Sequence, residues 1–158
     1  MAHLPKSDLY AQIESEARGL MAGEADPIAN AANLSALISQ RLPDLNWAGF
    51  YRLQGDVLVL GPFQGNPACI RIPLGRGVCG TAALERTSQV VPDVHDFPGH
   101  IACDAASRSE LVVPILRDDV VLGVLDLDSP TPGRFDEEDR IGCEALVRAY
   151  VESLSQAV

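Results

Sequence analysis

Apolar residues recur at three- and four-residue steps in two stretches near the N-terminus, a spacing that places them on one face of a helix. The first stretch predicts a helix over residues 7–22 that ends near Gly23. Its apolar face consists of Leu9, Ile13, Ala17, Leu20 and Met21. The second helix is expected to have Asp26 as N-cap and Pro27 as its first residue, and to end at Pro43. Its apolar positions are Ile28, Leu34, Leu37, Ile38 and Leu42.

Short runs with the character of β-strands replace the helical spacing in the middle of the chain. The predicted strands are Asn46–Leu53, Val57–Phe63, Cys69–Ile72, Gln89–Val91, Glu110–Leu116 and Val120–Leu127. Tight turns at residues 54–56 and 117–119 join two pairs of these strands into hairpins. Because strands joined in this way run antiparallel, the sequence predicts a central antiparallel sheet.

Two further helices and a long loop complete the pattern. Helices are predicted over Val78–Arg86 and Asp136–Leu154, and a loop over Pro92–Arg108. The apolar stripe of the last helix consists of Ile141, Leu146, Val147, Tyr150 and Leu154. We therefore expect an α+β fold with helices packed on an antiparallel sheet. This order is similar to that of a GAF domain, in which loops over one sheet face enclose a small-molecule pocket. We expect residues 1–158 to form one such domain, with a core of about residues 30–150.

Composition and charge limit the classes of partner. The 158 residues carry 12 Lys and Arg against 22 Asp and Glu, a formal net charge of −10, and contain no basic cluster. Such a chain would repel a polyanion, so we expect no nucleic acid partner. No apolar run approaches the roughly 18 residues of a membrane span, and the N-terminus has no signal pattern. We therefore expect a cytoplasmic protein with no membrane partner.

Four cysteines are the candidate reactive groups, and in a reducing compartment they should not form permanent structural bridges. Cys143 lies on the last predicted helix and is expected to be buried filler. Cys69 begins a predicted strand and is compatible with filler or a redox role. Cys79 lies near a helix N-terminus, where the dipole would stabilise a thiolate. Cys103 lies in a polar loop, where a buried apolar role is least natural.

The spacing of the cysteines argues against a structural metal site. None of them forms the C-x2-C pair that is typical of zinc sites, so we expect no metal. A mixed zinc site of Cys79, His95, His100 and Cys103 is the weaker alternative. Otherwise His95 and His100 are expected to orient the long loop through hydrogen bonds.

Several longer motifs occur in a fixed order along the chain. They are N-W-A-G-F-Y from Asn46, G-V-C-G-T-A-A from Gly77, V-V-P-D-V-H from Val90, F-P-G-H-I-A-C-D from Phe97, S-E-L-V-V-P-I from Ser109 and G-V-L-D-L-D-S from Gly123. Together they resemble the motifs of the free methionine-(R)-sulfoxide reductase family over about residues 30–150. The resemblance is specific, because a generic GAF domain would not share three cysteines together with P-G-H-I-A-C-D.

The resemblance implies a reaction and a set of partners. The family reduces the R epimer of free methionine sulfoxide, not peptide-bound methionine sulfoxide, with thioredoxin as the expected reductant and without a metal or organic cofactor. A thiolate must attack the sulfoxide sulfur, and a second thiol must then convert the resulting sulfenic acid to a disulfide. We expect Cys103 to be the nucleophile and Cys69 the resolving cysteine. Cys79 competes for either role.

The reaction also needs an acid to protonate the sulfoxide oxygen, and three carboxyl groups are candidates. Asp126 and Asp128 lie two residues apart on one predicted strand and face the same way, while Glu110 begins the adjacent strand. Like charges in a closed pocket raise at least one pKa, and the other carboxylates could bind the substrate ammonium. Trp47 and Tyr51 are core candidates, but within the resemblance they form an apolar wall for the substrate methyl group.

Two other functions compete with catalysis. One is a GAF sensor that binds a small molecule without turnover, since a fold does not fix a function. The other is a thiol redox sensor that forms the same disulfide without a substrate. The sequence leaves the oligomeric state open, although many GAF proteins pair through their terminal helices and a homodimer is compatible with it.

Overall fold

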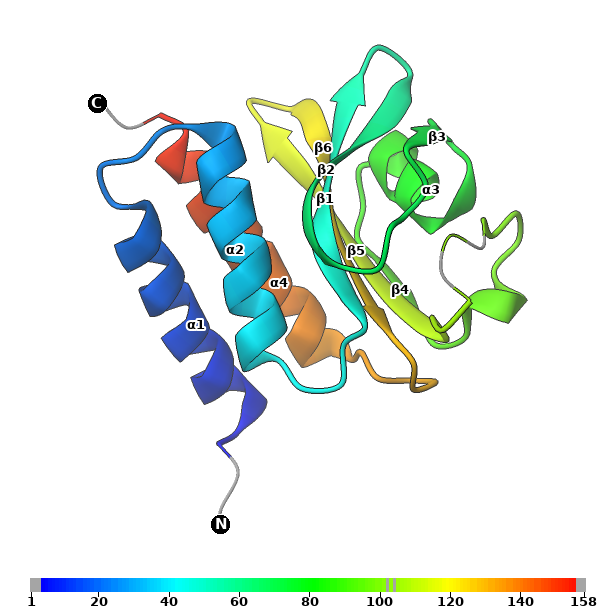
Figure 1. The fold of residues 1–158 in the computed structure, drawn as a ribbon, viewed down its shortest axis with the longest axis horizontal. Helices are drawn as coiled ribbons and strands as arrows, with labels where there is room; N and C mark the ends of the chain where they lie inside the picture. Colours follow the sequence, from blue (N-terminus) through cyan, green and yellow to red (C-terminus); the bar gives the residue numbers. More distant parts are fainter. Residues whose placement is uncertain (1–3, 102, 104, 156–158) are drawn as a thin grey trace.

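The computed structural model describes residues 4–101, 103 and 105–155, and Figure 1 shows how their helices and strands are arranged. The helices are α1 (Lys6–Met21), α2 (Pro27–Arg41), α3 (Gly77–Glu85) and α4 (Glu137–Ser153), with a 3-10 turn at Val94–Asp96. The strands are β1 (Trp47–Gln54), β2 (Val57–Gly65), β3 (Arg71–Pro73), β4 (Gln89–Val91), β5 (Ser109–Arg117) and β6 (Val120–Ser129). Within the described ranges, no helix is both long and apolar enough to cross a membrane.

The six strands form one antiparallel sheet in the order β3-β2-β1-β6-β5-β4. Strands β1 and β2 form the first predicted hairpin, β5 and β6 form the second, and the two hairpins meet where β1 pairs with β6. In that pairing Trp47 lies opposite Asp128, and Gly49 lies opposite Asp126. The predicted α+β class and antiparallel sheet are confirmed.

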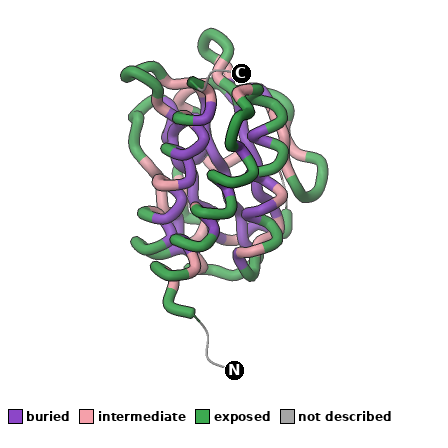
Figure 2. The backbone as a smooth tube through the Cα atoms, turned by 90° about the vertical axis from the view of Figure 1, so that its left-hand side faces the viewer, coloured by how far each residue is buried: buried purple, intermediate pink, exposed green. Residues whose placement is uncertain are grey.

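One face of the sheet is covered by α2 and α4, and α1 packs across these two helices from outside (Figure 1). Helix α2 begins as expected, because the Asp26 carboxylate accepts hydrogen bonds of 2.9 Å from the backbone N–H groups of Ile28 and Ala29. Figure 2 shows buried and exposed stretches alternating along these helices, as expected for amphipathic helices. The main apolar core lies between this helical layer and the sheet.

The opposite face of the sheet carries α3, next to the edge strand β3, and the loop that follows β4 (Figure 1). Helix α3 lies close to β3 because Gly80 has no side chain. A Cβ atom there would lie only 2.6 Å from the Pro73 carbonyl oxygen. A second, smaller apolar cluster forms under α3 and includes Leu58, Val78 and Val124. This face is less completely covered and contains the candidate site.

Three residues predicted on apolar helix faces are exposed instead. Leu20, Ile28 and Ile141 are 50%, 62% and 56% exposed. Leu20 lies at the edge of the buried stripe of α1, and Ile28 lies in the first turn of α2, before its buried stripe starts at Asn30. Ile141 precedes the buried Leu146 by five residues, which turns it about 140° away on a helix.

Two segments near the site also differ from expectation. The third strand begins at Arg71 rather than at Cys69, because only Arg71–Pro73 pair with β2 as a ladder. The loop predicted over residues 92–108 contains one 3-10 turn, which the Asp93 side chain caps at the backbone N–H of His95. Residues 102 and 104 of this loop lie outside the described residues.

Candidate active site

A cleft opens on the sheet face that carries α3 and the loop after β4. The space inside it that is open to a water-sized molecule is small, about 40 Å³. Strands β1, β3, β5 and β6 and the first turn of α3 line it, together with parts of the loops before β3 and before β5. Seven of the eight site residues predicted from sequence line the cleft. The eighth, Cys69, is bonded to one of them, Cys103.

Three carboxyl groups converge on the floor of the cleft. Asp126 and Asp128 lie two residues apart on β6, so both point to the same face of the sheet. Glu110 lies directly opposite Asp128 in the β5–β6 register, which adds the third group. Glu110, Asp126 and Asp128 are only 7%, 5% and 8% exposed. The predicted convergence of these acids is present in the structure, and their burial removes them from water that would otherwise solvate their charges.

The crowding of these acids changes their ionisation. Burial raises the pKa of Glu110 well above its usual range, and the neighbouring charges of Asp126 and Asp128 raise it further. Burial also raises the pKa of Asp126, although hydrogen bonds with Glu110 and Cys79 act in the opposite direction. Among the described residues, the buried Oδ1 atom of Asp126 has no hydrogen-bond partner. The cluster can therefore hold a proton near neutral pH, and one of its oxygens is open to a ligand.

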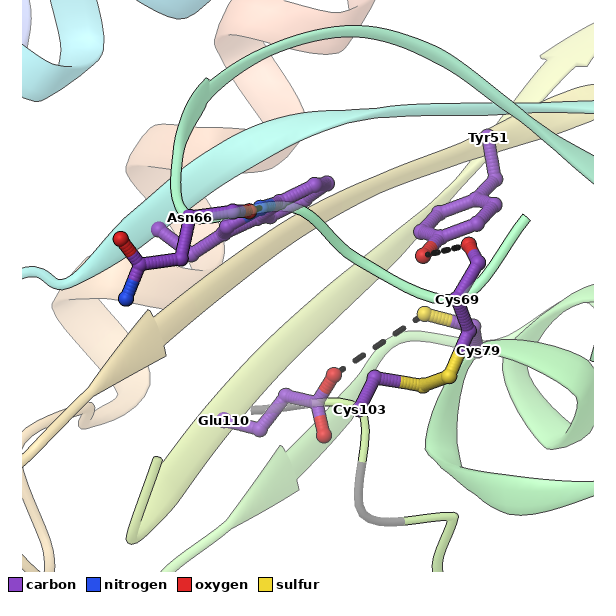
Figure 3. Close-up of a disulfide and its surroundings, with 7 residues drawn as sticks. Tyr51, Asn66, Cys69, Cys79, Cys103 and Glu110 are labelled. Carbon is purple, nitrogen blue, oxygen red and sulfur yellow. Dashed lines mark hydrogen bonds between the residues drawn. A yellow bond between two sulfur atoms is a disulfide. The ribbon is translucent and has the colours of Figure 1, made fainter. Parts of the chain in front are cut away.

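A disulfide between Cys69 and Cys103 lies beside the acids, with 5.3 Å between the two Cα atoms (Figure 3). Cys69 precedes β3, Cys103 lies in the loop before β5, and both are half-buried. The Tyr51 hydroxyl donates a hydrogen bond of 2.8 Å to the Cys69 carbonyl oxygen, which ties the Cys69 segment to β1. Two cysteines that are 34 residues apart in sequence are thus held together at the edge of the cleft.

Cys79 lies in the first turn of α3, but its environment opposes the thiolate that the helix dipole was expected to stabilise. The residue is buried, and its Sγ atom lies 3.9 Å from Glu110 Oε2 (Figure 3). Burial raises the pKa of the Cys79 thiol, and the charges of Asp126, Glu110 and Asp128 raise it further. The expectation of a low-pKa thiol at this position is corrected, because burial and three nearby acids outweigh the dipole.

The remaining cysteine and the histidines occupy different environments. Cys143 is fully buried on α4, as expected for filler, and burial raises the pKa of its thiol to about 12. His95 is exposed and its ring lies 3.0 Å from Asp93. His100 lines the cleft, and its own burial lowers its pKa. The mixed zinc site of Cys79, His95, His100 and Cys103 is not assembled in the described residues, because Cys103 is bonded to Cys69.

A different group of residues could hold a cation. Possible ligand atoms of Cys79, Glu110 and Asp126 lie within 4.8 Å of one another. Two of these residues are the acids on the cleft floor, and the third is the buried thiol beside them. A cation at this position would compete with any ligand of the acids.

An aromatic wall stands on the β1 side of the cleft. The rings of Trp47 and Tyr51 are stacked with centroids 5.9 Å apart, and Phe63 also stacks on Trp47, at 5.1 Å. The Trp47 indole N–H donates a hydrogen bond of 3.1 Å to the Asn66 carbonyl oxygen. The wall can bury an apolar group next to the acids and the disulfide.

Sequence reasoning missed two polar residues that line the cleft, Arg76 and Ser107. Arg76 lies between Gly75 and Gly77 and is the N-cap residue of α3, so in the sequence it looked like part of a turn. Ser107 is buried, and its hydroxyl accepts a hydrogen bond of 3.1 Å from the Asn46 side chain. A cation placed next to a helix N-terminus was the signal that could have identified Arg76 as a candidate.

Known proteins resemble this chain over most of its length. Residues 26–158 match the GAF domain family. The chain is 55% identical over 142 residues to the free methionine-R-sulfoxide reductase of Escherichia coli (strain K12), an alignment that covers 90% of this chain and 86% of that protein.

Two solved structures are similar in both sequence and fold. One is the free methionine-R-sulfoxide reductase (fRMsr) of Staphylococcus aureus in complex with substrate, with a TM-score of 0.89 and 51% identity, covering 92% of this chain and 95% of that one. The other is the free methionine-R-sulfoxide reductase from Neisseria meningitidis in complex with its substrate. Its TM-score is 0.92 at 40% identity, covering 98% of this chain and 93% of that one.

Proposed function

The chain belongs to the GAF-domain family of free methionine-R-sulfoxide reductases, and we propose that its cleft reduces free methionine-R-sulfoxide through Cys103, Cys69 and the buried acids. The observation that carries this assignment is a disulfide-forming cysteine pair beside three buried carboxyl groups. The pair supplies the two electrons of the reduction, and the acids supply a proton to the sulfoxide oxygen.

The first step is attack of the Cys103 thiolate on the sulfoxide sulfur. As methionine leaves, the oxygen passes to Cys103, which becomes a sulfenic acid. Cys103 is half-buried, whereas Cys79 is enclosed beside acids that oppose its ionisation. Because the thiolate is the reactive form, the more accessible Cys103 is favoured as the nucleophile over Cys79, whose ionisation the acids oppose.

The proton for the sulfoxide oxygen comes from the cluster of Glu110, Asp126 and Asp128. Glu110 is the favoured donor because burial and two neighbouring carboxylates oppose its ionisation. The ionised members of the cluster attract the substrate ammonium. Trp47 and Tyr51 bury the substrate methyl group next to the reacting sulfur.

The catalytic cycle closes at Cys69. Its thiol condenses with the Cys103 sulfenic acid, which releases water and forms the disulfide. Thioredoxin then reduces the disulfide by thiol–disulfide exchange, and the partial exposure of both cysteines supports access by such a dithiol. A homodimer formed through the terminal helices is compatible with this scheme, because the cleft lies on the sheet face opposite α1 and α4.

The decisive experiment measures methionine release with thioredoxin from three compounds. They are the free R epimer, the free S epimer and an N-blocked R sulfoxide. Turnover of the free R epimer alone is expected. Comparable rates on either of the other compounds would contradict the proposed specificity, while binding without any turnover would identify a sensor.

A thiol redox sensor is separated from the enzyme by alkylating the fully reduced protein with and without methionine-R-sulfoxide. The enzyme loses the Cys69 and Cys103 thiols stoichiometrically when the sulfoxide is added. A redox sensor keeps both thiols until a different oxidant is supplied.

A further inference from the structure

The proposed substrate is a zwitterion, but the floor of the cleft has only one sign of charge. Glu110, Asp126 and Asp128 can match its ammonium and its sulfoxide oxygen. None of these three acids can bind the substrate α-carboxylate, because a carboxylate would repel it. A negatively charged group buried without a partner is costly, so the site needs a cation or a set of N–H donors for the carboxylate.

Most polar groups that line the cleft are already committed to other partners. The Trp47 indole N–H donates to the Asn66 carbonyl oxygen, and the Tyr51 hydroxyl donates to the Cys69 carbonyl oxygen. His100 lines the cleft, but burial and the nearby His95 lower its pKa, which favours the neutral ring. These groups are poor partners for an anion.

Arg76 is different in both charge and position. It lines the cleft and is exposed, whereas the acids on the floor are buried, so it lies at the mouth. Within the described residues no carboxylate is paired with Arg76, although acids outnumber bases in this chain by 22 to 12. Its guanidinium is therefore open to a ligand that enters the cleft.

The backbone next to Arg76 adds N–H donors. Arg76 is the N-cap residue of α3, and the three residues that follow it, Gly77, Val78 and Cys79, also line the cleft. The first N–H groups of a helix have no partner within the helix, and the helix dipole favours an anion at this end. An arginine and a helix N-terminus on the same rim form a suitable site for a carboxylate.

We infer that Arg76 and the first turn of α3 bind the α-carboxylate of the free amino acid. The inference rests on the proposed function and extends it. The reacting sulfur and the ammonium lie near the acids, with the sulfur next to Cys103, and the α-carboxylate points towards the mouth. A peptide-bound methionine sulfoxide has an amide in place of this carboxylate, so Arg76 is a residue that determines specificity for the free amino acid.

The test compares Arg76→Gln and Arg76→Lys with the parent protein on two substrates, free methionine-R-sulfoxide and its carboxamide. Charge-assisted hydrogen bonds have a strength that predicts a loss on the order of 10-fold in affinity. We expect Arg76→Gln to raise KM for the free acid by about 10-fold with kcat nearly unchanged. The carboxamide should have the same KM in Arg76→Gln and in the parent, and Arg76→Lys should recover part of the loss.

Arg71→Gln is the matched control. Arg71 is an exposed arginine on β3 that does not line the cleft, so this variant makes the same charge change without touching the site. If KM for the free acid is the same in Arg76→Gln and Arg71→Gln, the inference is wrong. It is also wrong if Arg76→Gln weakens both substrates equally, because that result would indicate a general disturbance of the cleft.

Binding to the disulfide form separates this inference from the proposed function, since Cys103 cannot attack there. Calorimetry on this form should show that Arg76→Gln weakens binding of the free sulfoxide relative to Arg71→Gln. Absence of turnover by the parent would overturn the proposed function alone. Equal binding by both variants, with normal turnover by the parent, would overturn the carboxylate assignment alone.

Discussion

At the scale of single residues, the acids on the cleft floor are placed where they oppose folding. Glu110 and Asp126 are buried on strands whose neighbours Leu111, Leu125 and Leu127 form part of the apolar core. The pKa of each of these two acids is higher in the folded protein than in the unfolded chain. At a pH between its two pKa values, the folded protein therefore binds more protons than the unfolded chain. The free energy of unfolding therefore falls as the pH rises through that window.

Replacing one of these acids by its amide should raise stability and lower activity. Glu110→Gln removes a group whose pKa burial raises, so its gain in Tm should be larger at pH 8 than at pH 4. We expect the single-turnover rate to fall on the order of 10²-fold in at least one of Glu110→Gln, Asp126→Asn and Asp128→Asn. Thermal unfolding at the two pH values and rapid-quench kinetics are the measurements.

The control for these variants is an acid outside the cleft. Glu144 is a partly buried acid on α4, hydrogen-bonded to Ser88 and paired with Arg140, away from the cleft. Glu144→Gln should therefore leave the single-turnover rate unchanged. If all three amide variants of the cleft react at the parent rate, the acids are structural and the proton has another source.

The cysteines should separate into three classes in a single turnover without added reductant. Cys103→Ser should release no methionine, because the proposed nucleophile is absent. Cys69→Ser should release one methionine per chain but recycle poorly with thioredoxin, since the sulfenic acid has no resolving thiol. Cys143→Ser should behave like the parent, because this thiol is buried on α4, across the sheet. Quantifying released methionine by chromatography checks all three.

Cys79→Ser decides between the two candidate nucleophiles. Its thiol is buried beside acids that keep it protonated, so this variant should retain the burst of methionine release. Loss of the burst in Cys79→Ser, together with its retention in Cys103→Ser, would reverse the proposed assignment.

At the scale of helices and strands, the apolar spacing was sufficient to predict most of the fold. The Asp26 cap and both hairpins lie where expected, because each depends on interactions between residues close in sequence. The predictions are wrong where contacts between residues far apart in the sequence determine the burial of a residue or the start of a strand. Ile28 keeps the helical spacing of α2 but lies outside its buried stripe. Strand β3 starts late because the disulfide and the Tyr51 hydroxyl hold Cys69 in place of a ladder.

In the candidate site, too, features that depend on nearby residues were predicted and features that depend on distant contacts were not. Side-chain alternation on β6 placed Asp126 and Asp128 on one face, and the hairpin register then brought Glu110 beside them. The pKa of Cys79 could not be predicted, because helix position is a local property whereas burial and three nearby acids are not. Arg76 had a local signal, a cation next to a helix N-terminus, but its place in the cleft depends on how α3 packs against β3.

A buried polar contact holds helix α1 against α4, and the spacing of apolar residues along the sequence does not predict it. The Tyr10 hydroxyl donates a hydrogen bond of 2.7 Å to Oδ1 of the fully buried Asp139. Tyr10→Phe would leave that oxygen without this donor, which should cost about 1–3 kcal/mol in the free energy of unfolding. Turnover should be unchanged, because the contact is on the helical face of the sheet. Denaturant unfolding and a turnover assay are the measurements.

Lys6→Gln is the matched control for the α1–α4 contact. Lys6 also bonds to Asp139, at 2.8 Å, but its side chain is 33% exposed. Solvent screening should limit its loss to below about 1 kcal/mol. A loss in Lys6→Gln as large as that in Tyr10→Phe would show that charge, not the buried hydroxyl, holds α1 in place.

At the scale of the whole molecule, the core and the site lie on opposite faces of one sheet. The larger apolar cluster fills the space under α2 and α4, and the cleft opens on the other face, beside α3 (Figure 1). The GAF family match begins at residue 26, yet α1 lies before it and packs on both α2 and α4. We therefore propose that residues 1–158 unfold as one cooperative unit.

The disulfide links two loops of this unit at the edge of the cleft, so its reduction should be visible in global stability. It closes a loop of 34 residues between Cys69 and Cys103, for which the chain-entropy relation gives about 4 kcal/mol. For a chain of this size that corresponds to a fall of roughly 10 °C in Tm on reduction. Calorimetry of the oxidised and reduced protein should show one transition in each state, shifted by this amount. Cys103→Ser should have the lower Tm in both conditions, since it cannot form the bond. Equal Tm values for the oxidised and reduced parent would mean that the bond constrains the native cleft as strongly as the unfolded chain, and two separate transitions would contradict the single unit.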